Sequence, residues 1–352
     1  MKYKKVVLKI GTNVITREDG KLDLLVMKAI ANQIAELKKE KTEVVVVSSG
    51  AMGAGRGLCA LPKTINDVAK RQILAAVGQP ALMHEYLQLF APHQMVCAQV
   101  LATKEDFRDR GHYLNMRNCF EALLKENIVP IVNENDTISI DELMFTDNDE
   151  LAGLIASMIQ AEALLILTTV EGVMREGKVV TKIQTFKEVE EDLSPQTSSF
   201  GRGGMVTKCH VAEKLSKLGI ATHILNGKNA NGLIRLMQGE AVGTAFMPKQ
   251  IKVSSVKRWV AESEGKEQGI VIVNRGAEEM LRSKEKIISL LPVGIVSIMG
   301  DFKKGDIIKI TNEKGESIGY GVAQYDAAKA LEFMGKKGKK ELIHYNTLFI
   351  QE

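Results

Sequence analysis

A lysine at the end of an apolar run near the start of the chain is the first residue that points to chemistry. Residues 6–8 are Val-Val-Leu, Lys9 follows them directly, and Gly11 and Thr12 come just after it. A lysine at the end of a buried strand is destabilising unless an anion meets it. In open α/β sheets ligands bind at the carboxyl ends of strands, where the N–H groups of a glycine turn and an ammonium group form a phosphate cradle. The segment therefore predicts a phosphate site, with a solvated strand end as the alternative.

A second segment of small residues, SSGAMGAG at residues 48–55, follows the apolar run 44–47. Small residues let backbone N–H groups and hydroxyls approach a ligand closely. The GxxxxGK[ST] spacing of a Walker loop is absent, and no well-placed acid supports a dinucleotide-binding fingerprint. A ligand-binding turn and a plain tight turn from strand to helix are the two interpretations.

Two clusters of Asn and Asp supply candidate polar groups. Residues 133–136, Asn-Glu-Asn-Asp, follow the apolar run 128–132, and Asp147, Asn148 and Asp149 precede a long apolar stretch. Asn148 or Asp149 could simply cap a helix. Groups of this kind can also bind a substrate ammonium, orient lysines or hold Mg²⁺ on phosphates.

The last candidate segment is GRGGMVTK at residues 201–208, which opens an amphipathic stretch. Its glycines and the N-terminus of the expected helix suit the phosphates of a nucleotide, and Lys208 adds a mobile positive charge. A surface loop is the alternative.

The elements that must position these groups alternate along the chain. Apolar runs at residues 6–10, 44–47, 95–101, 128–132, 164–167 and 222–225 are mostly too continuous for half-exposed antiparallel strands. Amphipathic stretches at 24–39, 68–89 and 205–218 lie between them. The alternation predicts an α/β fold with a mainly parallel open sheet covered by helices on both faces.

The chain has 352 residues, which suggests two domains. Composition changes at residues 252–268, around the only tryptophan, Trp259. We therefore predict a first domain at 1–251, a linker at 252–268 and a second domain at 269–352. Short β-rich segments at 269–274, 294–299, 306–311 and 317–324 predict that the second domain is a small β-barrel or sandwich.

Composition is that of a globular enzyme, with 45% apolar and 26% charged residues, and the net charge of +4 gives no warrant for nucleic-acid binding as the main activity. Four scattered cysteines predict neither disulfides nor a metal site, and favour the reducing cytoplasm. The apolar stretch 151–170 contains Gln160 and Glu162, so a helix leading into a buried strand explains it better than a membrane span. No targeting signal is visible at the N-terminus.

The order VVLKIGT, VVVVSSGAMGAG, IVPIVNENDT, FTDNDELAG and GRGGMVTK resembles the amino acid kinase family, and GDFKKGDIIKI with SIGYGVAQY is similar to the PUA domain of many bacterial members. The resemblance implies transfer of the γ-phosphoryl group of ATP, with Mg²⁺, to the side-chain carboxylate of L-glutamate. The product would be L-glutamate 5-phosphate, which enters proline biosynthesis. The resemblance further implies inhibition by proline, a homo-oligomer, and glutamate-5-phosphate reductase as a partner.

The same resemblance implies roles for individual residues. Lys9 and Lys208 would neutralise the transferring phosphoryl group, and Asp149 would hold them in place. The implied glutamate-binding residues are Ser49, Gly50, Asn133, Asp136, Asp147 and Asn148. The implied ATP-binding residues are Lys9, Gly11, Thr12, Thr168, Thr169, Arg202, Gly203, Gly204, Met205, Val206, Thr207 and Lys208. Relatives commonly carry Thr-Asp where this chain has Thr168-Thr169, and direct metal ligands are not identified.

Two alternatives stay open at this point. Kinases of the same fold act on aspartate, acetylglutamate or carbamate. PUA domains elsewhere bind RNA, but residues 269–352 carry 13 Lys and Arg against 11 Asp and Glu, a net charge of +2, which is a weak electrostatic footprint.

Overall fold

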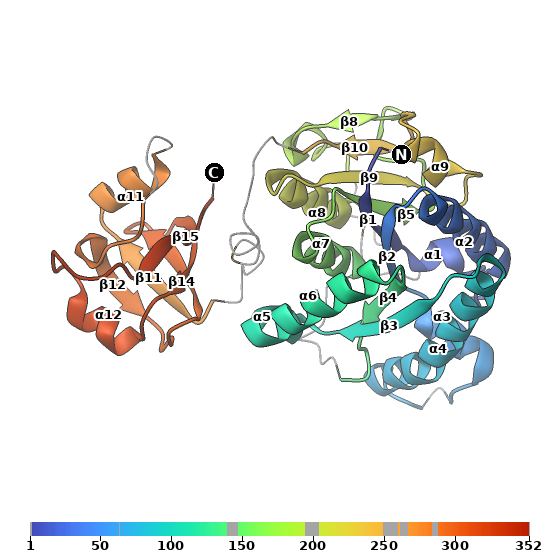
Figure 1. Ribbon diagram of the computed structural model, residues 1–352, viewed down its shortest axis with the longest axis horizontal. Coiled ribbons are helices and arrows are strands. Elements are labelled where there is room, and N and C mark those ends of the chain that lie inside the picture. The colour runs from blue at the N-terminus through green and yellow to red at the C-terminus, as the bar shows by residue number, and fades with distance from the viewer. Residues whose placement is uncertain are drawn as a thin grey trace. The chain divides into compact units, whose positions relative to one another are not determined.

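The computed structural model describes residues 2–62, 64–138, 147–193, 204–248, 260, 267–283 and 288–351. The chain divides into two compact units, Met1–Lys252 and Val253–Glu352 (Figure 1). Trp259 and nearly all of the predicted linker 252–268 lie outside the described residues, so the domain boundaries stay a prediction.

The first unit is built on an eight-stranded sheet in the order β3-β4-β2-β1-β5-β9-β10-β8. Its strands are β1 (Lys5–Ile10), β2 (Glu43–Ser48), β3 (Cys97–Ala102), β4 (Val129–Glu134), β5 (Ala163–Thr168), β8 (Lys182–Ile183), β9 (Ala221–Asn226) and β10 (Thr244–Phe246). A two-stranded hairpin joins β6 (Met174–Arg175) to β7 (Lys178–Val179). Every pairing in the large sheet is parallel except that of β9 with β10. The predicted mainly parallel sheet is confirmed, and β8 and β10 escaped prediction because two or three residues carry no readable pattern.

Helices cover both faces of this sheet, with α2 and α4 on one face and α7 and α8 on the other (Figure 1). The longer helices are α2 (Leu24–Lys39), α3 (Ala51–Leu58), α4 (Asp67–Phe90), α6 (Arg110–Lys125), α7 (Asn148–Met158) and α8 (Met205–Lys217). The shorter ones are α1 (Thr12–Ile15), α5 (Lys104–Arg108), α9 (Gly232–Met237), and the 3₁₀ segments η1 (Ala91–His93) and η3 (Phe186–Glu188).

The apolar stretch 151–170 is a helix leading into a strand, as its sequence predicts. Helix α7 ends at Met158 and β5 begins at Ala163 in the centre of the sheet. No helix in the described parts of the chain has the length and apolarity that crossing a membrane requires.

Alternation along β1 decides where Lys9 points. Leu8 and Ile10 belong to the hydrophobic core beneath α2 and α4. Because successive side chains of a strand point to opposite faces, Lys9 faces the other layer, where α7 and α8 lie. A lysine therefore occupies a core position of the central strand, with only 5% of its surface exposed.

The second glycine-rich segment is a helix rather than an extended turn. Gly50 caps α3 with φ at +109°, a conformation that a side chain would strain. Gly55 meets the backbone of Leu74 in α4, and Gly78 of α4 meets the backbone of Ala51, so a Cβ at either glycine would collide. These glycines thus bring α3 and α4 into backbone contact, a role that the sequence pattern did not distinguish from ligand binding.

The second unit contains a five-stranded sheet in the order β12-β11-β13-β14-β15. Its elements are β11 (Gly269–Val273), α11 (Arg275–Arg282), the 3₁₀ segment η4 (Pro292–Gly294), β12 (Ile295–Met299), β13 (Ile307–Asn312), β14 (Ser317–Ala323), α12 (Ala327–Phe333) and β15 (Ile343–Ile350). Only β11 and β13 pair in parallel. The unit has its own apolar core, which includes Val271, Ile310 and Leu342. The predicted β-rich character is confirmed, and β15 was missed because its exposed residues interrupt the apolar pattern.

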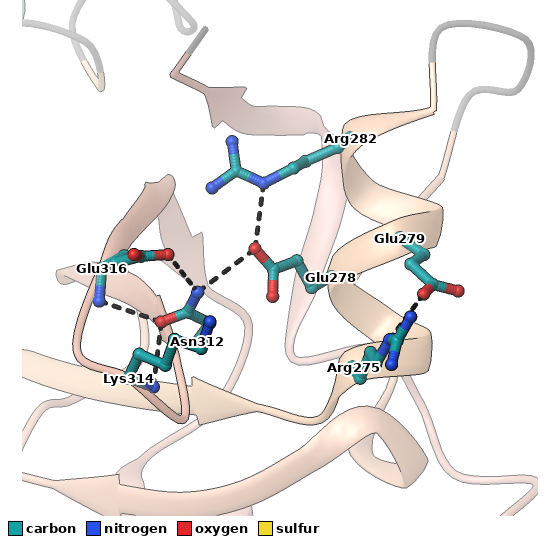
Figure 2. A network of polar contacts seen from close by, with 7 residues as sticks. All are labelled: Arg275, Glu278, Glu279, Arg282, Asn312, Lys314 and Glu316. Atoms are coloured by element: carbon teal, nitrogen blue, oxygen red, sulfur yellow. Dashed lines mark hydrogen bonds and ion pairs between the residues drawn. The ribbon is translucent and has the colours of Figure 1, made fainter.

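Asn312 ties the β13–β14 turn to helix α11 (Figure 2). Its side-chain oxygen accepts hydrogen bonds from the backbone N–H groups of Lys314 and Glu316 at 3.1 and 2.9 Å. Its amide nitrogen donates to the carboxylates of Glu316 and Glu278 at 2.7 and 3.3 Å. One side chain that is 6% exposed therefore satisfies four polar groups of two elements.

We expect Asn312→Ala to destabilise the second unit by about 1–3 kcal/mol, because it leaves several partners without hydrogen bonds. Calorimetric unfolding of the full chain measures the change. Arg275→Gln is the control. Arg275 and Glu279 form an ion pair on α11, the helix that Asn312 contacts, but their side chains are 88% and 64% exposed, and such surface pairs contribute little to stability. Equal effects of the two substitutions would contradict the central role of Asn312.

Candidate active site

A cavity of about 480 Å³ opens at the carboxyl ends of β1, β2, β4 and β5. This is the edge where parallel sheets bind ligands. Of the residues singled out in the sequence, the following line it: Lys9, Gly11, Thr12, Ser49, Gly50, Asn133, Asp136, Asp147, Asn148, Thr168, Thr169, Gly204, Met205 and Lys208. Asp149 lies buried behind the two lysines, Val206 and Thr207 lie on α8 away from the lining, and Arg202 and Gly203 lie outside the described residues.

Two lysines from different elements share one buried aspartate. The Nζ atom of Lys9 lies 2.6 Å from Oδ1 of Asp149, and Nζ of Lys208 lies 2.8 Å from Oδ2. Asp149 has no exposed surface, while Lys9 and Lys208 are 5% and 7% exposed and both line the cavity. The two ammonium groups are therefore held side by side with one face toward the cavity.

The charges of this cluster are coupled. Burial by itself raises the pKa of Asp149, but the ammonium groups of Lys9 and Lys208 outweigh burial and hold that pKa well below its usual range. Asp149 is therefore ionised at neutral pH. Two positive charges against the single negative charge of Asp149 give these three residues a net charge of +1, which favours an anion beside the two ammonium groups.

A chain of neutral polar groups forms the next part of the wall. The side-chain nitrogen of Asn148 donates to the Ser49 hydroxyl at 2.8 Å and to the Asn133 side-chain oxygen at 3.0 Å. Asn133 donates in turn to Gln79 of α4 at 2.9 Å. These bonds join the ends of β2, β4 and α7, so the polar groups keep fixed positions beside the lysines.

Asp147 is the N-cap of α7 and its carboxyl group lines the cavity. Its Oδ1 accepts hydrogen bonds from the backbone N–H groups of Asp149 and Glu150 at 2.8 and 3.1 Å. Its Oδ2 is buried without a hydrogen-bond partner among the described residues. Burial and the neighbouring Asp149 raise the pKa of Asp147 to about 6. The carboxylate is therefore suited to a cation supplied by a ligand.

The other end of the cavity contains the glycine turn after β1 and the start of α8. The Gly11 N–H donates to the Leu167 carbonyl at 3.3 Å, which joins the turn to β5. Gly204 is the N-cap of α8 and provides no side-chain cap, so the first N–H groups of this 13-residue helix have no such partner. Backbone donors and Lys208 thus gather on one side of the cavity, an arrangement that suits phosphate oxygens.

Sequence reasoning missed several lining residues. Arg56 of α3 and Arg71 of α4 bring two guanidinium groups to the cavity, and Met174 and Asp192 line the side near Thr169. In the sequence Arg56 directly follows the segment of small residues, and Arg71 looks like an ordinary polar position of the amphipathic stretch 68–89. The lining of the cavity includes both arginines, and the backbone contact between α3 and α4 brings their two helices together.

Two protein families match parts of this chain. Residues 4–226 match the amino acid kinase family and residues 269–344 match the PUA domain. The first match covers more than half of the chain, so the chain belongs to the amino acid kinase family.

Three relatives that this chain resembles over its full length are glutamate 5-kinases. The glutamate 5-kinase of Chlorobaculum tepidum is 50% identical over 353 residues, which cover 99% of this chain and 98% of that protein. The glutamate 5-kinase of Bacteroides thetaiotaomicron is 45% identical and covers 99% of each chain. That of Dehalococcoides mccartyi strain CBDB1 is 38% identical, with 99% and 98% covered.

The raised pKa of Asp147 predicts how the folding stability of the ligand-free chain depends on pH. The folded-state pKa of about 6 lies above the unfolded value of about 3.9, so the folded chain binds more protons between these values. Its stability therefore falls as the pH rises through this window. We expect Asp147→Asn to stabilise the chain at pH 7.5, by on the order of 1–3 kcal/mol, and to have little effect near pH 4. Unfolding by denaturant at both pH values measures this, and a pH-independent difference would contradict it.

Proposed function

We propose that this chain transfers the γ-phosphoryl group of ATP to the side-chain carboxylate of L-glutamate, giving L-glutamate 5-phosphate for proline biosynthesis. The observation that carries the proposal is the pair of lysines held by Asp149 at the edge of a cavity that has a phosphate-binding side and a polar side. The names of the full-length relatives support the choice of substrate.

The chemistry requires placement and charge neutralisation more than proton transfer. A carboxylate nucleophile is already ionised at neutral pH, so no general base is needed. In phosphoryl transfer the catalyst aligns the two reactants and stabilises the charge on the transferring group. Lys9 and Lys208, which approach the cavity from a strand and a helix, are assigned this task, and Asp149 is assigned as the residue that positions them.

ATP is assigned to the side of the cavity formed by Gly11, Thr12 and the start of α8, with Thr168 and Thr169 nearby. The backbone donors described above would bind its phosphates. The cavity supplies no protein cage for a metal: in the described parts of the chain no cluster of three or more His, Cys, Asp or Glu could hold one. Mg²⁺ usually binds one or two carboxylates together with substrate phosphates, and the buried Oδ2 of Asp147 fits that pattern. When bound, Mg²⁺ would neutralise phosphate charge.

Glutamate has two further charged groups that need partners. Asp136 lies on the polar side of the cavity and is assigned to the α-ammonium group. We assign the α-carboxylate to Arg71, because Lys9 and Lys208 are occupied with the reacting end and a guanidinium pairs well with a carboxylate. The next residue, Gln72, donates to the Thr137 carbonyl at 3.2 Å, which holds α4 against the segment that carries Asp136.

Four further properties rest on the family resemblance or, for the cellular location, on the scattered cysteines. Inhibition by proline, a homo-oligomeric state, a cytoplasmic location and an interaction with glutamate-5-phosphate reductase stay predictions.

We expect Lys208→Ala to reduce kcat by at least about 1,000-fold, because it removes a charge that acts mainly in the transition state. Coupled assay of ADP release with glutamate, ATP and Mg²⁺ measures it. Lys217→Ala is the matched control, since Lys217 lies on the same helix, is 47% exposed, and pairs with Glu213 at the surface. Near-normal turnover by a folded Lys208→Ala chain would defeat the assignment.

We expect Arg71→Gln to raise the KM for glutamate by about 10- to 100-fold with little change in the KM for ATP, since a charge-assisted hydrogen bond contributes about 1.5–3 kcal/mol. The α-amide of glutamate provides a second measurement, because the variant should lose the preference for glutamate over this analogue. Lys70→Gln, at the adjacent exposed residue, should change neither value. Equal increases in both KM values would place Arg71 outside the glutamate site.

A further inference from the structure

A second cavity, of about 560 Å³, lies in the second unit. The loop before β13, the residues that lead into α12, α12 itself and the segment before β15 form it. Lys304, Lys329, Lys339 and Lys340 line this cavity, and Asp326 is the one acidic residue among the lining residues. Its size lies within the usual range of small-molecule sites.

An aromatic ring brings two of these lysines together. The Nζ atoms of Lys329 and Lys339 lie 5.5 and 5.0 Å from the ring centroid of Phe333. Both distances permit cation–π attraction. Phe333 packs edge-on against Tyr325 with the ring centroids 5.5 Å apart, and the Tyr325 hydroxyl donates to the Lys340 carbonyl at 3.0 Å. The loop that carries Lys339 and Lys340 is thereby fixed to the aromatic pair.

The positive charges of the cavity have little counter-charge from the protein. Among residues 267–283 and 288–351, ion pairs join Arg275 to Glu279, Arg282 to Glu278 and Lys309 to Glu267. None of these pairs uses a lysine of the cavity. Asp326 accepts a hydrogen bond from the backbone N–H of Lys304 at 2.6 Å, so part of its bonding capacity is already used.

We propose that this cavity binds a polyphosphate group. Several ammonium groups that converge without ion-pair partners favour a multivalent anion, and lysine is a common point-charge partner of phosphate. Lys329 and Lys339 lie over the ring of Phe333, so phosphate groups rather than a stacked base fit the site. The inference is independent of the proposed kinase activity, because all of its residues lie in the second unit.

Isothermal titration of the full chain with sodium tripolyphosphate at low salt, without Mg²⁺, tests the proposal. We expect wild type to bind two equivalents, one in the active-site cavity and one here. The double variant Lys329→Gln/Lys339→Gln should bind the second equivalent at least ten-fold more weakly. If the active-site cavity does not bind phosphates, wild type binds one equivalent and the double variant none, so failure of the two proposals is distinguishable.

Lys336→Gln/Lys337→Gln is the matched control, because it removes the same charge from exposed positions of the same segment that do not line the cavity. It should keep both binding events. A fluorescent oligouridylate identifies the phosphate source: its weaker binding to the cavity variant alone indicates a nucleic-acid backbone, and unchanged binding indicates a free polyphosphate. Equal tripolyphosphate binding by all three chains, or equal losses in both variants, would overturn the proposal.

Discussion

The sharing of one buried carboxylate by two lysines is the interaction on which the first unit depends. Burying an ion is costly unless it is paired, and Asp149 is buried only because Lys9 and Lys208 contact both of its oxygens. The three residues come from β1, α7 and α8. Any displacement among these elements would leave a buried charge unpaired, so the cluster specifies how the helices sit on the sheet as well as the charge of the cavity.

The backbone architecture makes this arrangement possible. Parallel strands deliver their carboxyl ends to a single edge, so the residues after β1, β2, β4 and β5 meet although they are far apart in sequence. Side-chain alternation on β1 sends Leu8 into one layer and Lys9 into the other. Gly55 and Gly78 let α3 and α4 approach closely, which brings Arg56 and Arg71 to the same cavity.

The second unit is stabilised, and its lysines are positioned, by different interactions from those of the first unit. Its sheet has its own apolar core, and Asn312 organises the turn between two of its strands. Its cavity lysines are clustered by an aromatic ring, whereas the lysines of the first unit are clustered by a carboxylate. The lysines of the exposed cluster form no ion pair with an acid in the described parts of the chain, while the buried cluster requires an acid. The difference follows from the cost of burying charge, which water removes at the surface.

The sequence by itself determined the class of fold and most of the candidate residues. Continuous apolar runs and amphipathic stretches predicted the central strands and helices α2, α4, α7 and α8, because burial against a sheet leaves a strong pattern, whereas α6 was not predicted. Lys9, Lys208 and the Asn and Asp clusters stood out because they follow apolar runs or accompany glycines. The family resemblance implied that Asp149 holds Lys9 and Lys208. Tertiary structure alone decided the environment of the second oxygen of Asp147, the place of Arg71 in the cavity and the gathering of lysines around Phe333. The spacing of apolar residues indicates which side of each segment is buried. Contacts between side chains distant in sequence depend instead on how the packed helices and strands are aligned.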